Sequence, residues 1–388
     1  MFGRSSGAAD QRVEERSSDR TESPDPQLAV RDLRTHFGDE FDLRVTVEVG
    51  TNEIVALLGP SGCGKTTTLR CVAGVETPDD GTIDIGGRRV FGDGVSLPPE
   101  RRDIGMVYQN YAIWPHKTVY DNVAFPLQHG DHSVEGDEDA HVRSVLRALE
   151  IEELADEPAS DLSGGQQQRT ALARSLVYDP DLLLLDEPLS NLDRELRKNM
   201  RNELQRLQHD LDVSMLYVTH DQEEAFYLAD RVLVMNDGRV VERGRPRDLY
   251  QRPSAAFTRR FIGARNRFDG TIETVDGERI VRSDVIDFPL DNVEFVADGG
   301  TNGSVSWFIR ASDVGVGSFA GRSDGRLEFS GTVVAEGILG DDYEVTVRVD
   351  GADSDLVVTT ERFHSFDRGD DIDLNIRPAS IQVYPAEE

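Results

Sequence analysis

Hydrophobic residues form strand-like patterns at four places before residue 220. Apolar residues occupy every second position over 41–49, which predicts a half-buried strand of an antiparallel sheet. The segment 54–58 is continuously apolar and ends at Gly59, which is typical of a central strand buried on both faces. Two further apolar runs, at 181–186 and 215–218, predict short buried strands.

Helical spacing appears between and after these strands. Apolar residues recur at three- and four-residue intervals over 142–149 and again over 192–211, which predicts two amphipathic helices. Strands that alternate with helices are typical of an α/β layer with a largely parallel sheet. Apolar segments on both sides of the turn 236–238 predict a β-hairpin over 231–241.

The pattern changes after about Ile262. Short alternating strands separated by Gly, Asp and Ser turns replace the helical spacing and predict a separate all-β domain. Residues 309–316 and 376–383 resemble each other, so this domain is expected to hold two related small β units. The second unit is expected to be built around the alternating apolar residues of 343–349.

The charge balance excludes some partners. The 388 residues include 42 Lys and Arg against 73 Asp and Glu, a formal net charge of −31, and only three residues are lysines. Such a balance argues against a nucleic-acid partner and a polybasic membrane anchor, because both need basic side chains beside phosphates. High acidity with little lysine is also typical of proteins from concentrated salt, so a halophilic source is our hypothesis.

The chain carries no pattern of its own for secretion or membrane insertion. Cys63 and Cys71 are a poor disulfide framework for this length, which favours a reducing cytoplasm. The polar segment 1–27 lacks the apolar stretch of a signal peptide and is expected to be a disordered tail. The longest leucine run, 182–185, is far shorter than a membrane span. Any role at a membrane is therefore expected to depend on a partner.

A phosphate-binding motif follows the apolar strand 54–58. Residues 59–66 have the pattern G-x-x-x-x-G-K-[ST] between a predicted strand and a predicted helix. Glycines let backbone N–H groups surround a phosphate, Lys65 can reach the β- and γ-phosphates, and the Thr66 hydroxyl can bind Mg²⁺. The residues predicted to bind nucleotide here are Gly59, Pro60, Ser61, Gly62, Cys63, Gly64, Lys65, Thr66 and Thr67.

Further candidate residues follow downstream. Asp186 and Glu187 end the leucine-rich strand, where one carboxylate can hold Mg²⁺ through water while its neighbour polarises an attacking water. His220 ends the next strand, and Ser163 opens a helical stretch within Leu-Ser-Gly-Gly-Gln. Structural alternatives remain open: the acids and Ser163 could cap helices, and an isolated histidine is often structural.

These motifs, in this order, resemble the ATP-binding cassette (ABC) ATPases over roughly 28–262. The sequences at 105–109, 114–116, 186–193 and 217–221 are similar to the subunits that energise binding-protein-dependent importers of sugars, polyamines, iron or thiamine. The resemblance implies an α/β P-loop NTPase fold with a helical subdomain, followed by an all-β small-barrel domain of the TOBE type. It also implies an ATPase that uses ATP and Mg²⁺ at the cytoplasmic face of the cell membrane.

The residue patterns and the resemblance together divide the chain into four parts, of which the tail is an addition to the family pattern. These are a disordered tail (1–27), an ATP-binding cassette (28–245), a helical linker (246–265) and a C-terminal β regulatory domain (266–388).

Individual roles follow from the same resemblance. Gln109, which ends a predicted strand, would contact Mg²⁺ and water, and His220 would bind the γ-phosphate. Phe37 would stack on adenine; Phe41 competes for that place but fits a core residue better. The residues expected to contact ATP held by the opposite subunit are Ser163, Gly164, Gly165, Gln166 and Asp193. The expected catalytic residues are Glu187, His220, Gln109 and Lys65, and the expected metal ligands are Thr66, Gln109 and Asp186.

The implied partners are a second cassette, either identical or different, two integral membrane permeases and, indirectly, an extracellular solute-binding protein. Residues 110–123 would line the groove for the permease, because Tyr111, Ile113 and Trp114 exposed together would need a partner. The segment 264–268 lacks the Met-Asn pair of maltose-type subunits, which favours iron, polyamine or related solutes. The alternatives are a soluble ABC ATPase of DNA repair or translation, and a solute-sensing regulator.

Overall fold

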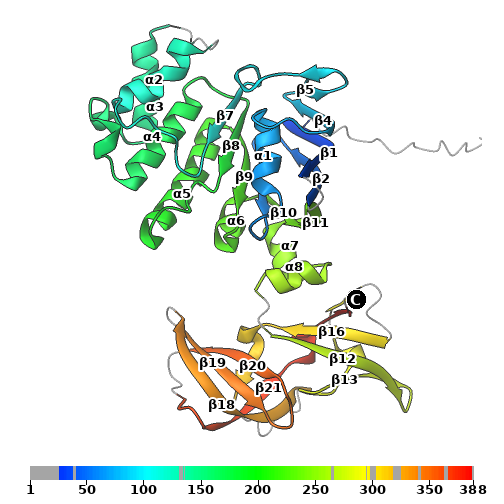
Figure 1. Cartoon of the computed structure of the whole chain (residues 1–388). Helices are drawn as coiled ribbons and strands as arrows, with labels where there is room; N and C mark the ends of the chain where they lie inside the picture. The colour runs from blue at the N-terminus through cyan, green and yellow to red at the C-terminus, as the bar shows by residue number, and fades with distance from the viewer. Residues whose placement is uncertain are drawn as a thin grey trace, which may run out of the picture.

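The computed structural model describes residues 26–37, 41–130, 134, 136–263, 266–293, 295–297, 303–317, 325–339, 342–361 and 366–386. Most of the predicted tail, residues 1–25, lies outside this part, as do Ala264 and Arg265. The described chain forms an α/β region and an all-β region, joined by two short helices (Figure 1). None of the helices in the described part is both long and apolar enough to span a membrane.

One eleven-stranded sheet organises the α/β region. Its strands are β1 (Leu28–Phe37), β2 (Phe41–Val49), β3 (Ile54–Leu58), β4 (Asp80–Ile85), β5 (Arg88–Gly92), β6 (Val95–Ser96), β7 (Ile104–Val107), β8 (Leu182–Asp186), β9 (Ser214–Thr219), β10 (Arg231–Asn236) and β11 (Arg239–Gly244). They are ordered β6-β5-β4-β1-β2-β11-β10-β3-β9-β8-β7. Only β10, β3, β9, β8 and β7 form a run of parallel neighbours, so the largely parallel sheet that the sequence predicts occupies one half, and the other half is mainly antiparallel.

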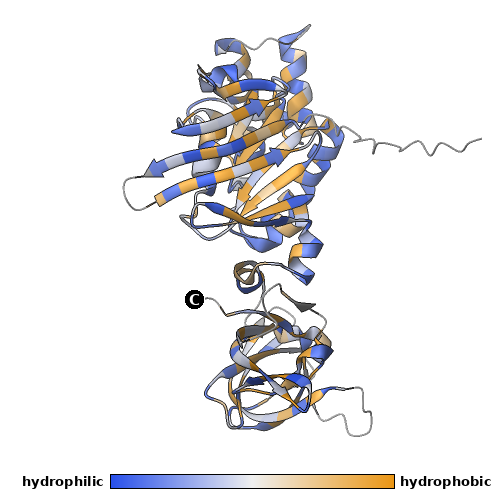
Figure 2. Ribbon diagram, turned by 90° about the vertical axis from the view of Figure 1, so that its right-hand side faces the viewer, coloured by the Kyte–Doolittle hydropathy of each residue, from blue (hydrophilic) through white to orange (hydrophobic). Residues whose placement is uncertain are grey.

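Burial explains why the strand patterns differ. In β3 the side chains of Ile54, Ala56 and Leu58 enter one core and those of Val55 and Leu57 enter another, so every position is apolar. In β2 only alternate residues are buried, because one face of that strand meets the core. Figure 2 shows the same contrast as continuous orange in the central strands and alternating colours in the outer ones.

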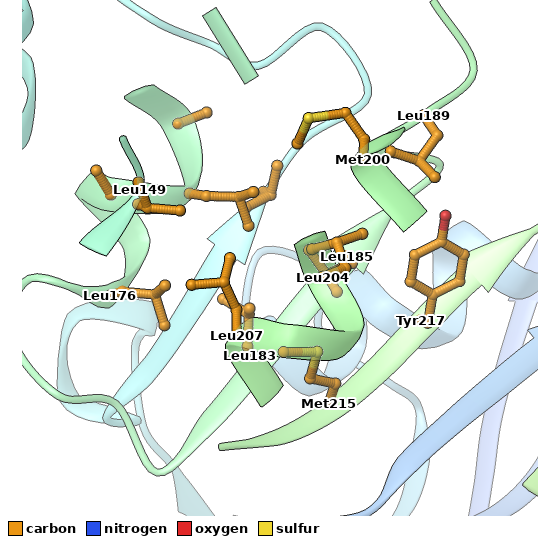
Figure 3. Packing of buried hydrophobic residues seen from close by; sticks show 14 of the residues in the cluster. Leu149, Leu176, Leu183, Leu185, Leu189, Met200, Leu204, Leu207, Met215 and Tyr217 are labelled. Atoms are coloured by element: carbon orange, nitrogen blue, oxygen red, sulfur yellow. The ribbon is translucent and has the colours of Figure 1, made fainter. Parts of the chain in front are cut away.

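Six helices accompany this sheet: α1 (Lys65–Ala73), α2 (Val119–His129), α3 (Glu138–Ala148), α4 (Gly164–Leu176), α5 (Arg194–Leu211) and α6 (Gln222–Leu228). Helices α2, α3 and α4 pack together as a subdomain at one side of the sheet (Figure 1). The helix expected over 192–211 begins at Arg194, so Leu192 lies in the preceding loop. Leu204 and Leu207 on α5 pack over Leu183, Leu185 and neighbouring residues of one core (Figure 3).

The all-β region contains two sheets around one core. Its strands are β12 (Asn266–Val275), β13 (Glu278–Ser283), β14 (Phe288–Pro289), β15 (Phe295–Val296), β16 (Gly303–Ile309), β17 (Val314–Val316), β18 (Leu327–Leu339), β19 (Asp342–Val349), β20 (Asp355–Glu361), β21 (Asp371–Ile376) and β22 (Gln382–Pro385). One sheet has the order β14-β13-β12-β16-β22-β15 and the other β17-β21-β18-β19-β20. Both sheets contribute buried residues to a single apolar cluster.

The internal similarity predicted from the sequence has a structural counterpart. Residues 309–316 run from the end of β16 through a 3-10 turn (Ala311–Asp313) into β17, and residues 376–383 run from β21 through a second turn (Pro378–Ser380) into β22. The two segments also pair with each other, β17 with β21 and β16 with β22. Each repeat therefore passes from one sheet to the other. Four further 3-10 turns lie at Pro99–Arg101, Glu152–Leu154, Ala159–Asp161 and Leu290–Asn292.

Helices α7 (Pro246–Gln251) and α8 (Ala256–Phe261) connect the two regions. Toward the α/β region, the backbone N–H and hydroxyl of Ser254 donate to the Glu242 carboxylate of β11. Toward the all-β region, Tyr384 Oη donates to the carbonyl of Pro253 at 2.7 Å, and Gln382 Nε2 donates to the carbonyl of Gln251 at 2.6 Å. The two helices are thus hydrogen-bonded to both regions.

Candidate functional site

The loop between β3 and α1 needs glycine at several positions. Gly62 and Gly64 have φ values of +82° and +102°, which side chains rarely adopt. A Cβ on Gly59 would lie 2.3 Å from the carbonyl oxygen of Met235. The glycines of the predicted phosphate-binding motif therefore have a structural cause, and the loop leads directly into the N-terminus of α1.

Lys65 is the first residue of α1 and folds back over the loop. Its Nζ donates to the carbonyls of Gly59 at 2.8 Å and Pro60 at 2.9 Å, and the residue is 5% exposed. An ammonium group has three protons, so two are held by the loop and one remains for a further acceptor. The loop thus fixes the ammonium beside the backbone N–H groups at the helix start.

Thr66 and Asp186 place two hard oxygen ligands side by side. Thr66 Oγ1 donates to Asp186 Oδ1 at 2.9 Å, linking the start of α1 to the end of β8. Burial raises the pKa of the Asp186 carboxyl, which means that the charged form is destabilised by its surroundings. A bound divalent cation would favour that charged form, and hydroxyl and carboxylate oxygens are ligands that Mg²⁺ prefers, so these residues fit Mg²⁺.

Glu187 and His220 form a pair across neighbouring strand ends. Glu187 Oε2 lies 3.0 Å from His220 Nδ1, because β8 and β9 are adjacent and parallel and both end at this edge of the sheet. Glu187 has a φ of +45°, held by the hydrogen bond from its N–H to the carbonyl of Val218. Strain at a non-glycine residue next to buried Asp186 marks this edge as a candidate active site.

Gln109 lies two residues beyond β7, in a loop, whereas the sequence placed it at the strand end. Its Nε2 donates to Ser190 Oγ at 3.4 Å, and its carbonyl accepts from Asn191 Nδ2 at 2.8 Å. These contacts hold Gln109 against the segment that follows Glu187. The loop position arises because β7 is only four residues long and leaves its partner strand after Val107.

The aromatic group after Gln109 differs from the expectation. Tyr111 is buried, while Ile113 and Trp114 are half-buried, so they do not form an exposed set. Tyr111 and Ile113 pack into the core, and Arg174 of α4 donates to the carbonyls of Tyr111 and Ala112 at 2.8 Å and lies 4.8 Å from the Trp114 ring centre. Sequence reasoning missed Arg174, because no local pattern marks an arginine that binds a loop 62 residues away.

The Leu-Ser-Gly-Gly-Gln segment begins α4 as a capping box. Ser163 Oγ accepts from the Gln166 N–H, and Gln166 Oε1 accepts from the Ser163 N–H at 2.8 Å. Gly164 and Ser163 are exposed, while a Cβ on buried Gly165 would come within 3.0 Å of Leu196 on α5. The helix-capping interpretation of Ser163 is therefore correct, and the exposed helix start remains available to an anion.

Asp193 also caps a helix. Its Oδ1 accepts from the Leu196 N–H at 2.9 Å at the start of α5, and the residue is exposed. Phe37 is the last residue of β1 and pairs in register with Phe41, but its side chain lies outside the described part of the structure. Phe41 is half-buried against the core, and its ring lies 3.2 Å from the position of a Cβ on Gly64.

Two residues that sequence reasoning missed, Glu224 and Arg197, hold the residues on either side of His220. Glu224 on α6 is 2% exposed and accepts hydrogen bonds from Tyr217 Oη and Thr219 Oγ1, both at 2.8 Å. Arg197 on α5 donates to the carbonyl of Leu192 at 3.0 Å and to Asp221 Oδ2 at 3.4 Å. The residues on both sides of His220 are thus fixed to α5 and α6.

Comparison with known proteins identifies the family. Residues 43–190 match the ABC transporter family and residues 308–383 match the TOBE domain. The spermidine/putrescine import ATP-binding protein PotA of Oleidesulfovibrio alaskensis is 39% identical over 360 residues, which cover 90% of this chain and 92% of that protein. The chain belongs to the ABC transporter family. It is accordingly an ATPase with a C-terminal TOBE domain, as the sequence motifs predict.

Two further ABC proteins show how far the similarity extends. The xylose/arabinose import ATP-binding protein XacJ of Haloferax volcanii is 38% identical over 374 residues, covering 93% of this chain and 94% of XacJ. The structure of CbiO1 from Clostridium perfringens, part of the ABC transporter complex CbiONQ, has 28% identity and a TM-score of 0.51. It covers 58% of this chain and 91% of CbiO1, so that likeness spans little more than half of the chain.

Proposed function

We propose that this ABC ATPase is the ATP-hydrolysing subunit of a binding-protein-dependent importer. The observation that carries the proposal is the similarity to import ATP-binding proteins over nine-tenths or more of both chains, β domain included. The solute is a polyamine, a sugar, iron or a related small solute. The subunit itself does not contact that solute, because permeases and an extracellular binding protein recognise it.

Hydrolysis is assigned to the edge of the sheet where β3, β8 and β9 end. The loop 59–64 and α1 would surround the phosphates of ATP with backbone N–H groups. The third N–H of the Lys65 ammonium group, which the loop carbonyls leave unused, would donate to the β- and γ-phosphates. Thr66 and Asp186, with Gln109, would hold Mg²⁺, whose charge neutralises the phosphates. Phe37 and Thr67 would complete the nucleotide site.

Glu187 and His220 would act on the attacking water. Glu187 would polarise the water, and His220, held by its contact with Glu187, would bind the γ-phosphate. The left-handed backbone conformation of Glu187 and the hydrogen bonds of Glu224 and Arg197 keep this pair in place. Positioning of this kind is most of what phosphoryl transfer needs from a protein.

A second cassette would complete the site. Ser163, Gly164, Gly165, Gln166 and Asp193 would face the ATP of the opposite subunit, and the exposed start of α4 supplies N–H groups suited to the γ-phosphate. ATP would then hold two cassettes together, as a homodimer or heterodimer, at the cytoplasmic face of the membrane. Closure and reopening of this dimer would drive two permease subunits.

Glu187→Gln tests the assignment of hydrolysis. The substitution keeps the size and one acceptor of the side chain but removes the base, so kcat should fall by about 100-fold or more while ATP binding persists. Gel filtration with ATP and Mg²⁺ should then show an accumulated dimer. Glu223→Gln is the matched control, because its exposed carboxylate pairs with Arg201 at the surface and should leave turnover unchanged. Full turnover in Glu187→Gln would overturn the assignment.

Co-purification from membranes tests the importer proposal separately. The full chain should retain two integral membrane permeases after detergent extraction, and mass spectrometry should identify them with a solute-binding protein. Deleting the gene should abolish uptake of the solute, and Glu187→Gln should fail to restore it. An ATPase that purifies with nucleic acid or ribosomes instead would support the repair or translation alternative. An ATPase without membrane partners that responds to a solute would support a regulator.

A further inference from the structure

A cavity lies where the linker helices meet the TOBE-containing region. Its volume is about 390 Å³, and its walls come from α7, α8, the turn after β16 and the turn before β22. The basic residues that line it are Arg252, Arg259 and Arg310, and the acidic one is Asp313. The net charge of the chain is −31, so a cavity lined by three arginines and one carboxylate has a charge opposite in sign to that of the average surface.

Arg259 is the unusual member of this group. It is 1% exposed, yet its Nε and Nη1 have no hydrogen-bond partner among the described residues. Burial, and secondarily the charge of Arg310, lower its pKa to about 10, so the guanidinium stays charged at neutral pH. A buried charge without partners is costly, and proteins normally pair it or give it a ligand.

The neighbouring Arg310 does not compensate for that charge. Its guanidinium stacks on the Tyr250 ring at 3.5 Å and donates to the Tyr250 carbonyl. Within the described part of the chain, no carboxylate forms an ion pair with Arg259 or Arg310. Asp313 shares the cavity, where burial raises its pKa and the positive charges of Arg310 and Arg259 oppose that rise only in part.

We propose that this cavity is a binding site for a small oxyanion, a phosphate or sulfate group, held between the guanidinium groups of Arg259 and Arg310. Guanidinium groups suit such oxygens because each can donate two parallel hydrogen bonds. The hydroxyls of Ser312 and Ser380 line the same cavity and can donate as well. The volume leaves room for the rest of a small phosphorylated metabolite.

The position of the site gives the anion a structural effect. Arg259 belongs to α8, on the cassette side, while Arg310 follows β16 of the all-β region. An anion bound by both would therefore add a bridge to the contacts that Gln382 and Tyr384 already make with the linker. The inference does not depend on the importer proposal, because it rests on this cavity alone.

Hydrogen–deuterium exchange of the full chain tests the proposal, with inorganic phosphate or sulfate as the probe at constant ionic strength. Saturating ADP and Mg²⁺ occupy the nucleotide loop, and peptides covering 59–68 report separately on any anion there. We expect saturable protection of peptides covering 247–262 and 309–316. Arg259→Met should raise the half-saturating anion concentration by about tenfold or more, because it removes charge-assisted hydrogen bonds. Arg259→Lys should retain part of the response.

Arg260→Met is the matched control, because Arg260 is the next residue on α8, carries the same charge and is exposed. It should leave the anion response unchanged. Thermal unfolding distinguishes a binding arginine from a structural one. Without anion, the melting temperature of Arg259→Met should equal or exceed that of the wild type. With phosphate, it should be lower than that of the wild type. Wild-type protein without saturable protection by either anion would overturn the proposal, whether or not the variants fold. Equal protection in Arg259→Met would also overturn it.

Discussion

At the scale of single residues, the buried carboxylate of Glu224 links β9 to α6 behind His220. It accepts hydrogen bonds from Tyr217 and Thr219, and burial raises its pKa. A raised pKa in the folded state means that the folded protein binds this proton more tightly than the unfolded chain. The contribution of Glu224 to the free energy of unfolding is therefore largest at low pH and falls as pH rises from its unfolded to its folded pKa.

Glu224→Gln removes this titration but keeps an oxygen acceptor for both hydroxyls. We expect the difference in free energy of unfolding, variant minus wild type, to increase as pH is raised from about 4 toward neutrality. Urea denaturation across that range measures it. Glu224→Ala, in contrast, should destabilise the cassette by about 1–3 kcal/mol, because the Tyr217 hydroxyl loses its buried partner. A difference that stays flat or falls with pH would contradict the assigned burial effect.

The sequence identifies some site residues and misses others for a physical reason. Lys65 and Thr66 belong to one contiguous motif, and Glu187 follows a recognisable strand, so local pattern was enough to select them. Arg174 and Arg259 carry no such pattern. Arg174 acts through carbonyls more than 60 residues away, and Arg259, on the short helix α8, has the side-chain type of a solvent-exposed residue until the fold buries it.

At the scale of elements, α5 packs its apolar face onto one of the two cores of the cassette. Leu204 on its buried face is 1% exposed, whereas Leu211 at its end is 46% exposed. Leu204→Ala should lower the free energy of unfolding of the cassette by about 2–5 kcal/mol, through lost burial and the cavity left behind. Leu211→Ala, the matched control on the same helix, should change it by less than about 0.5 kcal/mol.

Tryptophan fluorescence can follow that transition. Trp114 lies beside α2 and α4 in the cassette, and Trp307 lies in the β region, so a Trp307→Phe background leaves a cassette-specific signal. Both leucine variants are compared in this background during urea denaturation. Equal losses for Leu204→Ala and Leu211→Ala would show that burial on α5 does not determine the stability of the cassette.

Periodicity predicts individual elements better than it predicts their arrangement. The alternation over 41–49, the apolar run over 54–58 and the similarity between 309–316 and 376–383 all correspond to observed elements, because each pattern records which faces are buried. The alternation over 41–49 predicts one strand of the antiparallel half of the eleven-stranded sheet, but not which strands lie beside it. Neighbouring strands there are set by contacts between distant segments, such as β4 with β1, which no local pattern encodes.

At the scale of the whole molecule, the linker helices hold together two regions that have separate cores. The contacts that Tyr384 and Gln382 make with the linker lie next to the cavity that contains Arg259. A small ligand there can influence the junction directly, because it would lie between α8 and the all-β region. The TOBE-containing region is thereby placed where binding can reach the cassette.

The net charge of −31 also belongs to the whole molecule, and it predicts a dependence on salt. Repulsion between exposed carboxylates extends over about 10 Å at 0.1 M salt and about 3 Å at 1 M, so added salt should stabilise the folded state. We expect the urea midpoint and the ATPase rate to rise together along a KCl series into the molar range. Replacing the exposed acids Glu278 and Glu336 by glutamine should shift the curve toward lower salt, because fewer charges then need screening. A midpoint that does not change along the series would contradict the halophilic hypothesis and leave the acidity without an electrostatic consequence for stability.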